Sequence, residues 1–465
     1  MAEIAYHDPG TAGDIHPEAQ TFTAMLYENR PEQRISNVGK PPTTRTNLLR
    51  NSGFHLFVAG VHARIHCLSK SAGDSMHPTQ QPNRPIVALT SIRFFAALTV
   101  AIGHYTQMGL LGLPAAIEDG GRPAVSLFFV LSGFVLAYNY HGSIGRTGVS
   151  RFYLARFARI YPVMLLSLGL AASVTVYMLG QHDTELLYGW YAIKSHPGIS
   201  LTLSLVAQLL LLTAWLPIAR MNQPWNGPAW SISCEAFYYA MFPWLLLKLL
   251  KMPNRSIALA CLAAWCLEGV WIFFALNYLP TERSGFVVSQ FPISHLAEFF
   301  MGAGAALWFV RARAKGYSRH RLGVVLVCLA LIAFPCIAAY HAPALIFFLE
   351  TPLFVALILG LALLERPVLG LLNRRPLVLL GEASFSLYLI HVPLAHWAYI
   401  AGFTRDDGWI ALVIAVALST VIFVSFEKPM RRRILQGARP AEFEPIGLRG
   451  SAIRLPPNTR PVEDI

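Results

Sequence analysis

The sequence predicts an all-α fold: a polytopic membrane helix bundle of about ten transmembrane helices plus one re-entrant or interfacial helix. Composition and hydropathy both point this way. Only 13% of the 465 residues are charged, against roughly 25% in soluble domains, and 55% are hydrophobic. Mean hydropathy is +0.48, and apolar runs of about 20 residues, each able to cross a bilayer as a helix, recur from residue 86 onward. These observations disfavour a soluble enzyme.

The first segment, residues 1–85, is polar and has little periodicity. It has no basic stretch followed by an apolar core at Met1, so we expect no secretory signal peptide and a disordered extension. An alternative of equal weight is that translation starts at Met76, just upstream of the first apolar run. Either way, the functional domain is predicted at 86–433, with a cytoplasmic tail at 434–465.

Eleven apolar runs follow, and each is a candidate span. They lie at 86–108, 123–141, 160–180, 200–219, 229–247, 256–279, 291–310, 322–340, 343–364, 377–400 and 408–426.

The placement of Lys and Arg tests the direction of these runs, because basic residues favour cytoplasmic loops. The connections 142–159, 311–321 and 365–376 are basic, as is the segment after the last run. If all eleven runs crossed, the basic loop at 248–255 and every later basic loop would fall outside. Removing one crossing between residues 180 and 230 restores the pattern.

The run at 200–219 is the weakest span, because the Pro- and Asn-rich segment 217–228 follows it. We therefore predict ten crossings with both termini cytoplasmic. The outward-facing loops would be 109–122, 181–199, 280–290 and 401–407.

Other classes of site find little support. The six cysteines form no CxxC pair, and no histidines have zinc-site spacing, so we expect neither disulfides nor a metal. The formal charge is +12. We interpret these Lys and Arg residues as setting the orientation of the protein in the membrane rather than as binding nucleic acid, because basic patches interleaved with aromatic residues are absent.

Ionisable residues inside spans are costly, and they usually face a bundle interior or a water-filled cavity. Arg93 and His104 share the first run, and eleven residues bring them to within 20° of the same helix face. They are roughly 16 Å apart along the axis. A snorkelling Arg with an interfacial His competes evenly with a functional role.

The run at 229–247 holds Glu235 on a stripe with Ser231, Tyr238 and Phe242, at i, i+4, i+7 and i+11 spacing. In the ten-crossing topology Glu235 lies in the outer half, near the depth of His104. Catalysis and a neutral Glu bonded to helix backbone are equally supported by this pattern.

A third stripe joins Ser384, Tyr388 and His391 on one face of the run at 377–400. His391 also reaches the outer half. For His391 alone, packing beside Pro393 is the safer interpretation.

Two further features lie in the second and third runs. Arg156 and Arg159, at i and i+3, enter the third span at its cytoplasmic end, where they obey the positive-inside rule or bind phosphates bidentately. The pair Ser132 and Gly133 lies mid-span, where small residues most often permit close helix packing or let a long substrate pass.

Seven sequence segments, taken together in their order along the chain, are informative. They are Arg93-x10-His104, VSLFFVLSGF at 125–134, RFYLARFARIYP at 151–162, PAWSISCEAFYYAMFP at 228–243, HLAEFFMGAGAALW at 295–308, LGEASFSLYLIHVPL at 380–394 and FEKPMRRR at 426–433. Together, over about 84–433, the chain resembles the integral-membrane acyltransferase family 3, whose members O-acylate sugars of surface polysaccharides, nodulation factors and macrolides. Phe385 replaces a frequent Tyr, which is a conservative difference.

The resemblance implies ten membrane helices, a bacterial cytoplasmic (inner) membrane location and a set of site residues. The implied catalytic residues are His104, Glu235 and Arg93. Arg156 and Arg159 match the cytoplasmic basic motif of the family. From the sequence itself we further predict that Ser132, Gly133 and Tyr161 bind acyl-CoA together with these two arginines. We predict that the acceptor-binding residues are Trp230, Ser231, Tyr388 and His391.

Some relatives carry an added extracytoplasmic SGNH hydrolase-like domain. About 30 residues follow Arg433, so we expect no such domain here. The chain would then act alone or pass its acyl group to a separate extracytoplasmic acceptor protein.

The working hypothesis is transfer of a short acyl group, most simply acetyl from acetyl-CoA as cosubstrate, to a sugar hydroxyl of a carbohydrate or glycolipid acceptor. His104 would be the general base and Glu235 would orient it, with no permanently bound cofactor. Direct transfer is favoured over an acyl-enzyme. The alternative is a transporter or flippase for a glycolipid or small anion, although no internal repeat is found.

Overall fold

The computed structural model describes residues 85–114, 121–316, 319–338, 343–364 and 370–437. Within these residues the regular secondary structure is helical and no β-strand occurs, so the predicted all-α fold is confirmed. Of the predicted N-terminal extension only Pro85 is described; the alternative start at Met76 and most of the tail 434–465 also lie outside the described residues.

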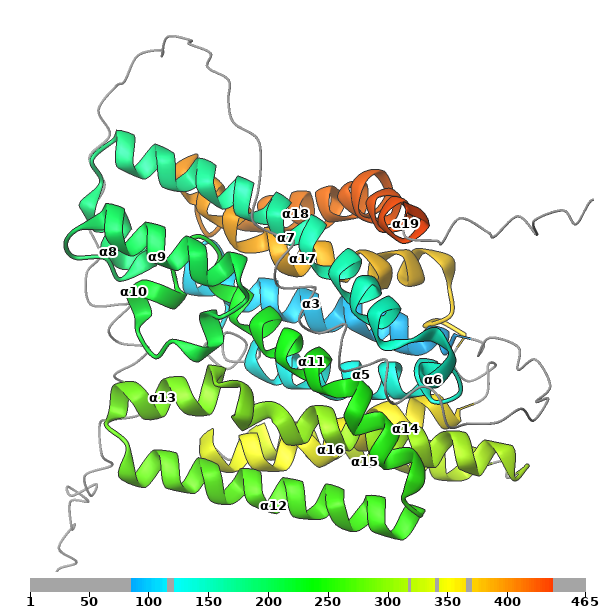
Figure 1. The fold of residues 1–465 in the computed structure, drawn as a ribbon. Coiled ribbons are helices and arrows are strands. Elements are labelled where there is room, and N and C mark those ends of the chain that lie inside the picture. The colour runs from blue at the N-terminus through cyan, green and yellow to red at the C-terminus, as the bar shows by residue number, and fades with distance from the viewer. Residues whose placement is uncertain (1–84, 115–120, 317–318, 339–342, 365–369, 438–465) are drawn as a thin grey trace, which may run out of the picture. The chain divides into compact units, whose positions relative to one another are not determined.

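The helices follow one another with short connections (Figure 1). Those that coincide with predicted spans are α3 (Val87–Gln107), α5 (Gly121–Tyr140), α7 (Val149–Gly180), α11 (Trp230–Lys251), α12 (Asn254–Tyr278), α14 (Leu296–Ala314), α15 (His320–Ala338), α16 (Pro343–Leu363), α17 (Arg375–Ile400) and α18 (Gly408–Ile422). The shorter elements are α6 (Ile144–Thr147), α8 (Thr184–Tyr191), α9 (Pro197–Leu209), η2 (Thr213–Trp215), α10 (Ala219–Asn222), η3 (Gly227–Ala229), α13 (Thr281–Gln290), η4 (Pro292–His295), the π-helical turn η5 (Phe423–Glu427) and α19 (Lys428–Gly437).

Seven helical stretches in the described part of the chain are long and apolar enough to cross a membrane. They contain α3, α5, α7, α12, α14, α17 and α18. The three other predicted spans correspond to α11, α15 and α16. A polytopic helix bundle is therefore observed, with a helix at each of the ten positions where a crossing was predicted.

The run at 200–219 does not form one long helix. α9 has 13 residues, which is about 20 Å at 1.5 Å per residue, and a hydrocarbon core is about 30 Å thick. The chain then turns at Leu211, whose φ is +57°, and continues through η2 and α10. Helix α9 is therefore shorter than a full crossing needs, and a re-entrant or interfacial helix at this run stays a prediction.

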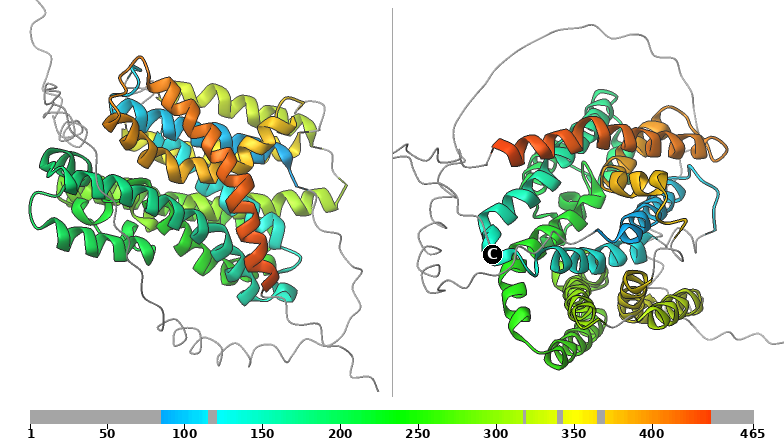
Figure 2. Two further views of the ribbon diagram at one scale, coloured as in Figure 1. Left: turned by 90° about the horizontal axis from the view of Figure 1, so that it is seen from above. Right: turned by 90° about the vertical axis from the view of Figure 1, so that its right-hand side faces the viewer.

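Helix α5 lies at the centre of the bundle, against α14, α3 and α16 (Figure 1). Helix α3 in turn packs along α17, which also contacts α7 and α18; the other two views show the same neighbours (Figure 2). The α5–α14 contact is close because Gly133 and Gly302 face opposite backbones: a Cβ on Gly133 would overlap the Phe299 carbonyl, and one on Gly302 would overlap that of Val130. Small residues at such crossings let helices approach.

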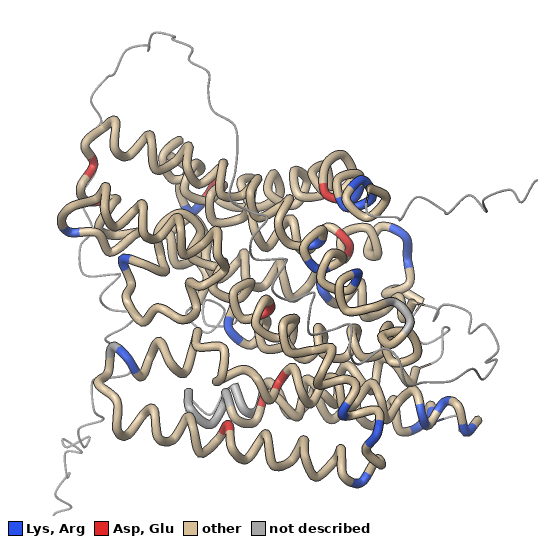
Figure 3. Tube along the Cα trace, viewed as in Figure 1, with Lys and Arg blue, Asp and Glu red and all other residues tan. Residues whose placement is uncertain are grey.

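Most Lys and Arg positions of the described chain lie toward one end of the helices (Figure 3). The helix ends concerned are the C-termini of α11 and α14 and the N-termini of α12 and α17, together with α19. The basic loops that the parity argument placed on one side of the membrane therefore lie together. Their common position is the arrangement that the positive-inside rule requires.

Candidate active site

The first element of the site is a pair of histidines from α3 and α17, which pack along each other. His104 Nδ1 lies 3.0 Å from His391 Nε2, and the two ring centroids are 5.0 Å apart. His391 is fully buried, and His104 is partly buried. The two residues are 287 positions apart in the sequence, so the contact is a product of the fold.

Two backbone carbonyls fix the tautomers of this pair. His391 Nδ1 lies 3.2 Å from the Leu387 carbonyl, and His104 Nδ1 lies 3.1 Å from the Val100 carbonyl. A carbonyl only accepts, so both Nδ1 atoms carry hydrogen, and the lone pair of His391 Nε2 accepts from His104 Nδ1. The arrangement leaves the unprotonated Nε2 of His104 with no hydrogen-bond partner among the described residues. His104 is thus the member of the pair that is free to take a proton.

Next to this pair is a pocket in the bundle interior, which we call the inner pocket. Its lining combines polar side chains with aromatic ones: Arg93, Val125, Phe128, Phe129, Ser231, Ile232, Glu235, Ser384, Phe385 and Tyr388. Tyr388 joins the pocket to the histidines, since its ring centroid is 5.8 Å from that of His391. Its hydroxyl lies 2.7 Å from Ser231 Oγ and donates to the Pro228 carbonyl.

Glu235 lines the inner pocket from α11, and its side-chain partner is Tyr239, which was not among the predicted site residues. Tyr239, one helical turn later, donates its hydroxyl hydrogen to Glu235 Oε2 at 2.8 Å. Ser132 Oγ lies 3.4 Å from the same hydroxyl. No hydrogen bond joins Glu235 to His104 among the described residues, and the side chain that contacts His104 is His391.

Arg93 lines the inner pocket, as its place on the face of His104 suggested. The carboxylates of Glu235 and Glu427 attract its charge, and Arg159 repels it. Arg93 is therefore a cation within the field of the pocket's own carboxylate. In an apolar surrounding such a charge acts strongly on a nearby polar ligand.

Arg156 lies within an aromatic cage. Its guanidinium carbon is 5.6 to 6.0 Å from the ring centroids of Tyr140, Phe152 and Tyr239, and its Nε is buried without a hydrogen-bond partner. Cation–π contacts of this kind stabilise a guanidinium without neutralising its charge. Tyr239, one ring of this cage, also bonds Glu235, so the cage adjoins the lining of the inner pocket.

Arg159 is paired with the last motif of the chain. Its Nη1 donates to Glu427 Oε1 at 2.7 Å, and Ser386 donates to the other carboxylate oxygen at 2.7 Å. The side chains are 13% and 1% exposed, so the pair is shielded from solvent. Arg159 also lies 4.8 Å above the ring of Phe385, which lines the inner pocket.

Three predicted binding residues have structural contacts. At Gly133 the backbone of α14 occupies the space that a side chain would need. Of the two predicted roles, close helix packing or passage of a long substrate, the structure shows close packing at this residue. Tyr161 donates to the Leu209 carbonyl at 3.2 Å, which ties α7 to α9. Trp230 packs between Phe129 and His295, with ring centroids 6.2 and 5.8 Å away.

A second polar cluster lies on the far side of α5 and was missed by the sequence analysis. Ser126 Oγ is 3.0 Å from Glu298 Oε1 and 2.9 Å from Glu350 Oε1, and His295 Nδ1 is 2.9 Å from Glu298. A hydroxyl donates one hydrogen, so the second carboxyl contact requires a proton on that carboxyl group. Glu268 interacts with both other glutamates. The shared proton joins α5, α14 and α16.

No arrangement of three or more His, Cys, Asp or Glu that could hold a metal ion occurs in the described residues.

Comparison with known proteins decides the family. Residues 86–428 match the acyltransferase 3 family, described as "Acyltransferase domain". The chain belongs to this family. It is 31% identical over 405 residues to the acyltransferase MdmB of Streptomyces mycarofaciens, an alignment that covers 77% of this chain and 94% of MdmB. No solved structure matches.

Two further relatives are similar over part of their length. It is 34% identical over 173 residues to protein 2 in the picA locus of Rhizobium radiobacter, covering 35% of this chain and 84% of that protein. It is 21% identical over 377 residues to O-acetyltransferase OatA of Staphylococcus aureus, covering 75% of this chain and 58% of OatA. The protein is a multi-pass membrane acyltransferase.

Some of the missed residues carried a usable signal. Tyr239 stands four residues after Glu235, the spacing at which helical side chains meet. Glu427 stands in the quoted segment FEKP, at the end of a span where a carboxylate is costly alone. Glu268, Glu298 and Glu350 are each isolated in apolar runs, and only the fold brings them together.

Proposed function

We propose that this acyltransferase moves a short acyl group, acetyl from acetyl-CoA in the simplest case, to a hydroxyl of a carbohydrate such as an exopolysaccharide or lipopolysaccharide precursor. The observation that carries the proposal is the free Nε2 of His104, fixed by His391 beside a pocket of mixed polar and aromatic lining. The printed name of OatA, an O-acetyltransferase, supports an oxygen acceptor and an acetyl group.

In the proposed reaction His104 Nε2 takes the hydrogen of the acceptor hydroxyl as its oxygen attacks the thioester carbonyl. The new C–O bond forms, the C–S bond breaks, and the thiolate of CoA takes the proton from His104 as it leaves. Acyl-CoA and alcohol thus give ester and free CoA, with no net proton change. His391 accepts from His104 Nδ1 throughout and stabilises the imidazolium as a positioning residue.

The inner pocket supplies the remaining contacts. Ser231, Tyr388 and Glu235 offer hydroxyl and carboxylate groups suited to sugar hydroxyls. Phe128 and Arg93 line the same space; the ring gives an apolar surface for a sugar face or a short acyl chain. The cation of Arg93 would position the donor within this pocket.

The donor would enter from the basic end of the bundle, which we assign to the cytoplasm, with the protein in the inner membrane and both termini cytoplasmic. Arg156 and Arg159 lie on the way from that end to the inner pocket, and both would attract the acidic donor. The acceptor would reach His104 from the opposite end.

The test uses inverted membrane vesicles, which expose the basic end, containing the full-length protein and [acetyl-14C]acetyl-CoA. We expect label in the glycan or glycolipid fraction, in base-labile ester form. Vesicles without the protein are the control. Movement of unmodified glycolipid across the vesicle without acetyl-CoA, and no label in any acceptor, would contradict the proposal and support a flippase instead.

A further inference from the structure

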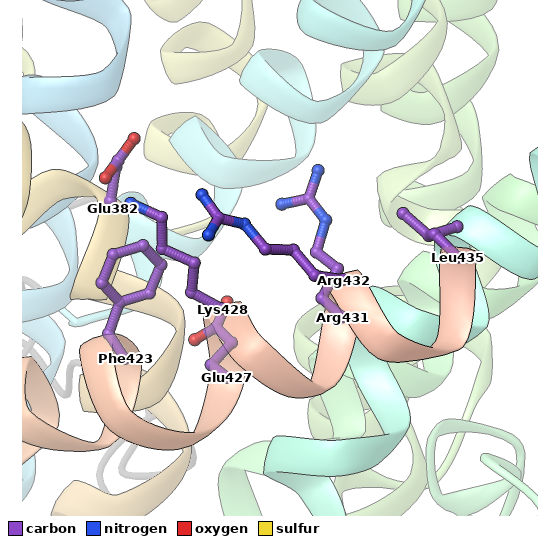
Figure 4. Close-up of a pocket in the computed structure, with 7 residues that line it drawn as sticks. All are labelled: Glu382, Phe423, Glu427, Lys428, Arg431, Arg432 and Leu435. Carbon is purple, nitrogen blue, oxygen red and sulfur yellow. The ribbon is translucent and has the colours of Figure 1, made fainter. Parts of the chain in front are cut away.

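A second pocket lies beside the C-terminal helix, where η5 passes into α19 (Figure 4). We call it the α19 pocket. It is lined by Glu382, Phe423, Glu427, Lys428, Arg431, Arg432 and Leu435. The first of these comes from α17, and the rest come from η5 and α19.

The spacing along α19 puts three cations on one side. Lys428, Arg431 and Arg432 stand at i, i+3 and i+4, so they share one helix face, with Leu435 one turn further. In Figure 4 the three side chains extend from the helix into the same space. None of the three forms an ion pair with any described residue. Arg433, adjacent in sequence, is turned about 140° from Lys428 and does not line the pocket.

The acidic residues of the α19 pocket do not neutralise it. Glu427 is held by Arg159 and Ser386, so its charge is already balanced. Glu427 also attracts Arg431, but Arg159 and Arg156 repel Arg431 more strongly. Glu382 is the other acidic residue of the lining, and it forms no ion pair with a described residue. Three cations therefore face one such carboxylate, and the pocket has excess positive charge. An anion placed there gains from two guanidinium groups and one ammonium group at once.

The position of the pocket indicates what kind of anion. Glu427 lines the α19 pocket, Arg159 bridges from Glu427 to the ring of Phe385, and Phe385 lines the inner pocket. One ion pair thus lies between the two pockets. A ligand with phosphates at one end and an acyl group at the other end of a slim arm would connect them.

We propose that the α19 pocket binds the 3′-phosphate and diphosphate of acyl-CoA through Lys428, Arg431 and Arg432. This inference rests on the proposed function, since it names the site where the acyl donor of that reaction is bound. It also moves the phosphate site outward from Arg156 and Arg159. Arg156 is enclosed by rings and Arg159 by its carboxylate, so both guide the arm of the donor rather than its phosphates.

The test measures acetyl transfer by the purified full-length protein in nanodiscs of zwitterionic lipid. With Arg432→Ala we expect KM for acetyl-CoA to rise about tenfold with kcat within about twofold, because a charged hydrogen-bonding partner of the phosphate is lost. The matched control is Arg433→Ala, which removes the same charge from the same helix outside the pocket and should leave KM within about twofold. An equal rise of KM for acetyl-CoA in both variants would overturn the proposed phosphate site, because general surface charge would then explain the effect.

A second measurement does not depend on any variant. Acetyl-3′-dephospho-CoA should show a KM at least about fivefold above that of acetyl-CoA in the wild type, and Arg432→Ala should narrow that ratio. Equal KM values for the two donors would refute a 3′-phosphate site.

Direct binding separates this inference from the proposed function. Adenosine 3′,5′-bisphosphate should bind the wild type and compete with acetyl-CoA, whether or not acyl transfer is detected. Acetyl transfer without such competition would refute phosphate binding in the α19 pocket, while the proposed acyltransferase reaction would stand. Loss of bisphosphate binding on adding phosphatidylglycerol, with no effect of acetyl-CoA, would show a lipid-headgroup site instead.

Discussion

Substitution of His391 tests its positioning role, because the predicted fall in kcat lies between no effect and the loss expected when the general base itself is removed. His104 Nδ1 has two acceptors, His391 Nε2 at 3.0 Å and the Val100 carbonyl at 3.1 Å. Removing His391 leaves the second, so the tautomer survives but its orientation weakens. A neutral hydrogen bond contributes about 1 kcal/mol net, which corresponds to about fivefold in rate. For His391→Ala we expect kcat to fall about five- to tenfold, with KM for acetyl-CoA unchanged.

The assay is steady-state acetyl transfer in nanodiscs, with His391→Gln as the matched variant. Gln places an amide oxygen near the position of Nε2 and can accept from His104, so it should recover most of the lost kcat. Removal of the general base itself should cost about 10²- to 10⁴-fold. If His391→Ala is as inactive as His104→Ala, His391 takes part in the chemistry; if it is fully active, it does not position the base. Both results refute the reasoning.

Three further predictions concern stability, and thermal unfolding of the detergent-solubilised protein measures each. Gly133→Ala should cost about 1–3 kcal/mol because its methyl group meets the Phe299 carbonyl, whereas Gly169→Ala, with open space around it, should not. Ser126→Ala removes the hydroxyl shared by two buried carboxyl groups and should cost about 1–3 kcal/mol; an unchanged melting temperature would contradict the shared-proton network. Glu427→Gln leaves Arg159 buried without its carboxylate and should cost about 3–5 kcal/mol, while replacing both residues by apolar ones should cost less.

The fold followed from the sequence because hydropathy reports depth in the membrane. Ten helices of the described chain lie where apolar runs were long. The turn after α9 lies at Leu211, inside an apolar stretch, so hydropathy did not indicate it. The same reasoning placed His104, Glu235 and His391 in one half of the bilayer. Depth alone leaves the lateral neighbours of each helix open.

For that reason the partnerships within the site were not predicted. His104 and His391 were expected at similar depth, but only the packing of α3 along α17 makes them a pair. Glu235 was expected to orient His104, and the structure gives it Tyr239 instead. Gly133 was compatible with a passage or with packing, and the contact with α14 decides for packing.

The central claim is that His104 Nε2 is the general base of acyl transfer. The direct measurement is single-turnover transfer from [acetyl-14C]acetyl-CoA to the host membrane glycan fraction, using purified wild type and His104→Ala at equal folded concentration. We predict that the variant still binds acetyl-CoA but transfers at least about 100-fold more slowly. Transfer by the variant at a rate within a few-fold of the wild type would contradict the account.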